Sequence, residues 1–241
     1  MAGQFQRPER VKNALDNRKL NLSAPTPGVN GAKASLIWGL YSNNPRLTVY
    51  TNDPNDSGEQ NGYGKISANL DGPTFFAFLE LLKVAVAAPG EFKDKIENKN
   101  FIFPGGKRSE RPVVVSELWA GKDKDGIVWI SVTARDRPKI KFSITSPDFH
   151  TFIHGDGTPY TPADGSKLFA LGYINLLDKM MAHLMCTLWV EPEKKDNGGG
   201  RGNYGGGGGG GGGGYNRGGG NSGGGGGGGG SSSGGDDDIP F

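Results

Sequence analysis

The sequence predicts a mainly β domain followed by a long glycine-rich tail. Six stretches alternate apolar and polar residues as strands do, and only two stretches show helical spacing. From Asp196 onward, 46 residues hold 27 of the 44 glycines and only four apolar residues. A segment of that composition cannot bury a hydrophobic core. The first 195 residues contain 78 apolar residues, which is enough for one globular domain.

Three strands are expected before the first helix. Apolar residues alternate over 33–41 and again over 46–52, and the turn-forming residues SNNP (42–45) join the two stretches into a hairpin. A long polar loop over 53–62 then leads to a third strand over 63–70.

The spacing changes after Leu70. Asp71 can cap a helix whose apolar residues recur three or four apart until Pro89-Gly90. A charged connection over 91–111 separates this helix from a second set of strands, expected over 113–120, 127–135 and 139–145. A second helix is expected over 162–188, because Thr161 and Asp164 resemble a capping box.

This order of elements is typical of the OB fold, a five-stranded Greek-key barrel. The sequence therefore predicts a mainly β OB-fold with a helix inserted after the third strand and an added C-terminal helix. The predicted organisation is an N-terminal arm over 1–32, the OB domain over 33–195, a disordered Gly-rich linker over 196–235 and an acidic tip over 236–241.

The distribution of charge and the number of cysteines limit the kinds of partner and site that this protein can have. The first 195 residues carry a net charge of +4 and the tail carries −2, so a basic body precedes an acidic tip. Cys186 is the only cysteine, which excludes internal disulfides and cysteine-based zinc sites. No stretch is long and apolar enough for a signal peptide or a membrane span, so a cytoplasmic protein without membrane contact is expected.

The outward faces of the expected strands combine cations, hydroxyl groups and large aromatic residues, with no carboxylate among them. Single-stranded DNA requires this mixture, because cations contact phosphates and aromatic rings stack on bases, at about 1–3 kcal/mol per base. Two alternatives remain open: Trp129 covers the barrel end or packs under the terminal helix, and loop 105–111 is simply a solvated charged loop. The candidate DNA-binding residues are Lys33, Arg46, Tyr50, Lys65, Lys107, Arg108, Arg111, Trp129, Arg135, Lys139 and Lys141.

Catalytic and metal-binding motifs are weak in this sequence. Gly106-Lys107 lacks the remaining residues of a phosphate-binding loop. Asp148, His150, His154 and Asp156 could face a metal, but no third histidine or cysteine lies nearby. No serine or cysteine has an evident base partner. We therefore expect neither an enzyme nor a bound cofactor or metal.

The last six residues, Asp236-Asp237-Asp238-Ile239-Pro240-Phe241, form an acidic run that ends in a hydrophobic plug. An apolar pocket with a basic rim would hold Phe241 and attract the aspartates. This segment resembles the C-terminal tip of bacterial single-stranded DNA-binding proteins (SSBs), and a Gly-rich linker before the tip is also their pattern. The body differs from the bacterial SSB domain, and bacteriophage SSBs with a divergent OB domain are the closer likeness.

The resemblance implies sequence-independent coating of single-stranded DNA in replication, recombination and repair. It also implies that the tip docks host or phage enzymes of these processes and can compete with DNA for the basic surface. Two alternatives stay open on the sequence: a strand-annealing protein or RNA chaperone with a Gly-rich tail, and a structural or condensate-forming protein in which the Gly-rich segment is the functional part.

Overall fold

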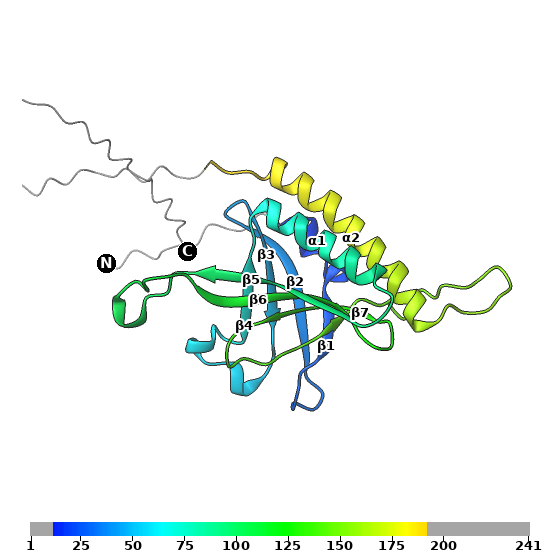
Figure 1. The fold of residues 1–241 in the computed structure, drawn as a ribbon, viewed down its shortest axis with the longest axis horizontal. Coiled ribbons are helices and arrows are strands. Elements are labelled where there is room, and N and C mark those ends of the chain that lie inside the picture. Colours follow the sequence, from blue (N-terminus) through cyan, green and yellow to red (C-terminus); the bar gives the residue numbers. More distant parts are fainter. Residues whose placement is uncertain (1–11, 192–241) are drawn as a thin grey trace, which may run out of the picture. The chain divides into compact units, whose positions relative to one another are not determined.

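The computed structural model describes residues 12–191, and the predicted linker and acidic tip lie outside this range (Figure 1). The described strands form two four-stranded antiparallel sheets with the orders β1-β2-β3-β4 and β5-β6-β7-β8. The first sheet contains β1 (Leu22–Pro25), β2 (Lys33–Tyr41), β3 (Asn44–Tyr50) and β4 (Lys65–Asn69). The second contains β5 (Phe92–Asn100), β6 (Val113–Lys122), β7 (Val128–Thr133) and β8 (Phe142–Ser143).

Two α-helices accompany the sheets. Helix α1 (Gly72–Ala87) connects the sheets, and α2 (Pro162–Thr187) follows the second sheet. Both begin as the sequence predicts, because Asp71 Oδ1 accepts a hydrogen bond from Thr74 N at 2.7 Å and Thr161 caps α2. The two helices lie side by side along the sheets (Figure 1). Short 3-10 helices occupy Ala14–Asp16, Arg18–Leu20, Pro54–Asp56, Glu59–Asn61 and Pro104–Gly106.

The mainly β prediction and both predicted helices are confirmed, but the strands are arranged differently from the expected barrel. They lie in two sheets that are not closed into one five-stranded barrel. The charged segment 91–111, predicted to be a connection, contains the long edge strand β5. The stretch 139–145, predicted to be a strand, is paired only over Phe142–Ser143.

The N-terminal segment contributes to the fold. Strand β1 lies within the segment 1–32, which was expected to be an arm. It pairs with β2, and its Leu22 and Ala24 are buried. Leu15 is also buried in the core. The folded region therefore begins before Lys33.

The core between the sheets is anchored by a hydrogen bond from β2 to α2. Trp38 Nε1 donates to Tyr173 Oη at 3.0 Å, and Tyr173 Oη donates to the carbonyl of Leu20 at 3.0 Å. Trp38 is 2% exposed and Tyr173 is 6% exposed, so neither polar group can turn to water instead. One hydroxyl thus ties the terminal helix to the first sheet and to the N-terminal segment.

Replacing Tyr173 with phenylalanine is expected to lower the free energy of unfolding by about 1–3 kcal/mol, because it leaves the buried Trp38 donor and the half-buried Leu20 acceptor without this partner. Denaturant unfolding of the two proteins measures this difference. The exposed Tyr63 offers a control, since Tyr63→Phe removes a hydroxyl from a side chain that is 67% exposed. Equal midpoints for Tyr173→Phe and the unmodified chain would contradict the prediction.

A buried ion pair joins the loop after β3 to the turn after β7. Arg137 Nε donates to Asp56 Oδ1, and Arg137 Nη2 donates to Asp56 Oδ2 at 2.7 Å. Thr51 Oγ1 donates to the same carboxylate at 2.7 Å. Burial alone would raise the pKa of Asp56, but hydrogen bonds from Arg137 and Thr51, with the guanidinium charge, hold it below its ordinary value.

Candidate nucleic-acid interface

The outward face of the first sheet is open and free of carboxylates among the described residues. Its strands alternate strictly, so every second side chain of β2, β3 and β4 points away from the buried core. The register forms rows across three strands, with Gly39, Arg46 and Asn69 in one row and Ser35, Tyr50 and Lys65 in another. The outward positions of these strands are Lys33, Ser35, Ile37, Gly39, Tyr41, Asn44, Arg46, Thr48, Tyr50, Lys65, Ser67 and Asn69.

Arg46 is fixed over an aromatic ring at one end of this face. Its Cζ lies 3.7 Å from the ring centroid of Tyr41, and its Nε donates to Asn69 Oδ1 at 2.5 Å. Gly39 stands opposite Arg46, and nothing lies within 4 Å of the point where a Cβ would be. Tyr41 is 44% exposed. This arrangement presents a held guanidinium and a partly open ring to a ligand, a combination that suits a phosphate beside a base.

A second cation and ring stand four residues along β3. Tyr50 and Lys65 are directly opposite in the register, and Lys65 Nζ lies 5.6 Å from the Tyr50 ring centroid. The hydroxyls of Thr48 and Ser67 are 3.2 Å apart between the two clusters. At about 3.3 Å per residue, Arg46 and Tyr50 are separated by about 13 Å along the strand. Lys33 lies exposed at the start of β2.

The outward face of the second sheet does not match the expectation. Glu97 and Glu117 lie on it among lysines, so the prediction of a carboxylate-free face is wrong here. Lys95 pairs with Glu117 and, at 3.0 Å, with Glu97, while Lys99 lies 3.1 Å from Glu97. Hydrogen bonding from Lys95 lowers the pKa of the Glu117 carboxyl, which therefore stays ionised at neutral pH. These ion pairs neutralise much of the positive charge on β5.

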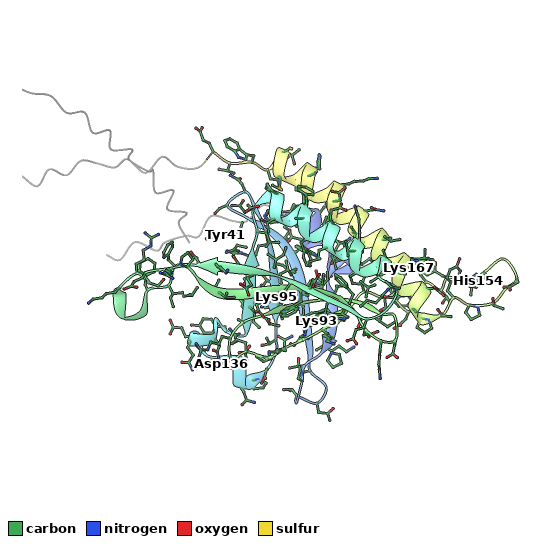
Figure 2. All side chains as sticks on the ribbon, viewed as in Figure 1. Tyr41, Lys93, Lys95, Asp136, His154 and Lys167 are labelled. Carbon is green, nitrogen blue, oxygen red and sulfur yellow. The ribbon has the colours of Figure 1, made fainter. Side chains whose placement is uncertain are left out.

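Trp119 is an aromatic residue on this face that the sequence reasoning did not single out. Lys93 Nζ lies 4.6 Å and Lys95 Nζ 5.2 Å from its ring, and both lysines are on β5 (Figure 2). Its Nε1 donates to Glu117 Oε2 and to Thr133 Oγ1, both at 3.2 Å. The ring is half-buried. Alternation within the predicted strand 113–120 was the available signal, since it places Trp119 opposite the buried Leu118 and Ala120.

Trp129 is buried rather than displayed, which corrects the predicted outward face of its strand. Only 4% of the residue is exposed, and all six residues of β7 are buried. The ring packs over Gly121, where a Cβ would lie 2.2 Å from Trp129 Cζ2. Lys141 Nζ lies 4.7 Å from the ring centroid. A central strand covered on both faces leaves the ring little surface on which a base could stack.

The remaining candidate residues lie outside the strands of the first sheet. Arg135 is exposed beside Asp136, with 3.4 Å between Nε and Oδ2, and Lys139 is exposed in the segment before β8. Lys107, Arg108 and Arg111 are exposed in the loop that joins β5 to β6, which projects beyond the sheets (Figure 1). The predicted partner-binding residues 236–241 lie outside the described residues.

Comparisons with protein-family models, curated proteins and solved structures each return no match for this chain. Between residues 12 and 191, no helix is long and apolar enough to cross a membrane. In the same part of the chain, no three side chains of His, Cys, Asp or Glu are grouped so that they could hold a metal ion.

Proposed function

We propose that this protein binds single-stranded DNA without sequence preference along the outward face of β2, β3 and β4. The observation that carries the proposal is the pairing of Arg46 with Tyr41 and of Lys65 with Tyr50 on one carboxylate-free face. Cations that contact phosphates and rings that stack on bases are the two parts of sequence-independent binding to single strands. The protein would coat DNA in replication, recombination and repair, and the proposal involves no catalysis.

The two sheets support a further part of the proposal, that the domain is a divergent OB-type barrel. β1 contacts β8 at one pair of edges, and β4 contacts β6 and β7 of the other sheet. The helix between the third and fourth strands of the expected barrel corresponds to α1, which lies between β4 and β5. OB domains bind single-stranded nucleic acid on one sheet face, as proposed here.

A titration tests the proposed function. The full chain is mixed with labelled oligo-dT, with the same length of oligo-U and with duplex DNA, and binding is followed by anisotropy at several salt concentrations. We expect oligo-dT to bind most tightly, with an affinity that falls linearly in log[salt] by about 0.7 per phosphate contact. Preference for oligo-U would indicate the RNA-chaperone alternative, and binding to none of the three would indicate a structural protein.

We also propose that the acidic tip 236–241 docks partner enzymes. Deleting Phe241 is expected to abolish capture of replication, recombination and repair proteins from a bacterial lysate, because the tip loses its apolar anchor. Affinity for oligo-dT should be retained. Tyr215→Ala, an aromatic change in the predicted linker, is the matched control. Capture of the same partners by the Phe241-deleted chain would contradict the recruiting role.

A further inference from the structure

The loop between β5 and β6, here called the basic loop (residues 101–112), displays apolar and cationic side chains together. Phe103 is 64% exposed and Ile102 is 41% exposed. The loop carries Lys107, Arg108 and Arg111 against a single carboxylate, Glu110. An aromatic and an aliphatic residue are exposed side by side here, with cations around them. Exposed apolar groups with a polar rim are typical of interaction surfaces.

The basic loop is ordered by its own contacts. Ser109 N donates to the carbonyl of Ile102 at 2.8 Å, and Ser109 Oγ donates to the carbonyl of Arg111 at 2.9 Å. Arg108 Cζ lies 3.7 Å from the ring centroid of Phe101. The exposed side chains are therefore presented on a preformed turn, which reduces the entropy lost on binding.

The segment before α2, here called the acidic loop (residues 146–161), has the complementary character. It carries Asp148 and Asp156 and has no lysine or arginine. An open depression of about 400 Å³ lies against it. Its lining mixes apolar and aromatic side chains with Asp148 and hydroxyl side chains. The apolar and aromatic part is Pro147, His150, Phe152, Tyr160 and Pro162, and the hydroxyl part is Thr145, Ser146, Thr151, Thr161 and Ser166.

The walls of this depression are also held in place. Tyr160 N donates to the carbonyl of Phe152 at 3.0 Å, and the rings of His154 and Tyr160 stack with 3.8 Å between their centroids. Ser166 Oγ, at the base of α2, donates to the carbonyl of Ile144 at 2.7 Å. The depression is thus a built feature of the described unit.

The two loops project from opposite ends of the described unit. The basic loop lies at the far end of the β5–β6 hairpin, whereas His154 marks the acidic loop at the other end (Figures 1 and 2). A basic loop therefore cannot reach the depression of its own chain. Because they lie at opposite ends, the basic loop and the depression are each accessible to another molecule.

We propose that the basic loop of one copy binds in the depression beside the acidic loop of a second copy. Phe103 and Ile102 would contact the apolar and aromatic part of the lining, and Lys107 and Arg111 would face Asp148. The occupant is a second copy because the basic loop and the depression each combine apolar side chains with charge of opposite sign and belong to the same chain. Such a contact is head-to-tail, and where the rotation between copies does not close a ring it continues from copy to copy as an open series.

This inference goes beyond the proposed function, because it concerns contacts between protein copies and holds in the absence of DNA. An open head-to-tail series places neighbouring molecules in a row with their first sheets repeated at a fixed spacing. On a long single strand, each bound copy would then favour binding of the next, which is cooperative coating.

Sedimentation velocity of the full chain without DNA tests the proposal over a range of concentrations. Phe103→Ser is expected to weaken self-association at least tenfold, as loss of a central aromatic contact does. Tyr63→Ser, which removes an aromatic residue of similar exposure outside both loops, should leave association unchanged.

A charge exchange separates this contact from any other role of the same residues. The variant with Lys107→Glu and Arg111→Glu should associate weakly with itself, and so should Asp148→Lys, because like charges then meet. An equal mixture of the two should recover association. The charge-reversed basic loop of the first variant then meets the charge-reversed depression of the second, and the basic loop of the second meets the unmodified depression of the first. If Lys107 and Arg111 served only to bind DNA, mixing the two variants would not restore association.

Three results would overturn the proposal. A chain that stays monomeric up to about millimolar concentration, far above the Kd of a typical specific contact, has no such interface. Association that survives Phe103→Ser arises at another surface. Association that disappears when residues 196–241 are removed, with both loops unchanged, would assign the basic loop to the acidic tip instead of the second copy.

Discussion

Replacing Arg137 with methionine is expected to lower the free energy of unfolding by about 3–5 kcal/mol, the usual effect of breaking a buried ion pair at one partner. The side chain of Asp56 is only 4% exposed and that of Arg137 only 12% exposed. Without the guanidinium, the carboxylate keeps the hydrogen bond from the neutral Thr51 hydroxyl but loses its counter-ion. It must then remain as a buried uncompensated charge or take up a proton.

Denaturant unfolding measures this effect, and two variants control it. Arg135→Met removes an exposed cation two residues away and should change the unfolding midpoint little. The double variant Asp56→Leu with Arg137→Met removes both charges and should regain most of the lost stability. A single Arg137→Met chain as stable as the unmodified one would show that the pair contributes nothing.

The same ion pair predicts a dependence on pH. The pKa of Asp56 lies below its ordinary value of 3.8, so its contribution is fully present above that value and is lost as pH falls through the folded-state pKa. The free energy of unfolding can be measured from about pH 5 to about pH 2, the range in which carboxyl groups titrate. Over this range the double variant should lose less stability than the unmodified chain.

Much of the fold follows from local pattern. The strict alternation over 33–41 and 46–52, and the capped apolar spacing after Asp71 and Thr161, predicted β2, β3, α1 and α2 close to their observed bounds. Strand β5 was not predicted because it lies at the edge of its sheet, and its sequence, FKDKIENKN, has few apolar residues and so shows no alternation. β1 was missed because it is four residues long and ends in a proline, as edge strands permit.

The candidate site was predictable only in the first sheet. There one face is buried and the other open, so alternation assigns each side chain correctly, Arg46 and Lys65 included. In β7 alternation fails, because both faces of the strand are covered, and Trp129, Ser131 and Thr133 are buried together with the residues that face the core. Alternation within the predicted strand 113–120 places Glu117 on the same face as Trp119, but Glu97 could be placed there only once the register of β5 with β6 was known.

These differences lead to a sharp test of where DNA binds. Tyr50→Ala is expected to weaken oligo-dT binding by about 5- to 150-fold, the equivalent of one lost base stack of roughly 1–3 kcal/mol. Lys65→Gln should weaken binding to all sequences alike and reduce the salt slope by about 0.7, the value for one phosphate contact to a single strand. Anisotropy titrations over a range of salt concentrations measure both effects.

The second sheet supplies the matched control, because Lys95 is a lysine beside a ring, as Lys65 is. Lys95 is paired with Glu97 and Glu117, so it is not free to contact a phosphate. Lys95→Gln therefore removes no phosphate contact. Its salt slope should equal that of the unmodified chain. The opposite pattern, with an altered slope for Lys95→Gln and an unaltered one for Lys65→Gln, would move the DNA path to the face around Trp119. In that case Trp119→Ala, and not Tyr50→Ala, would carry the loss in affinity.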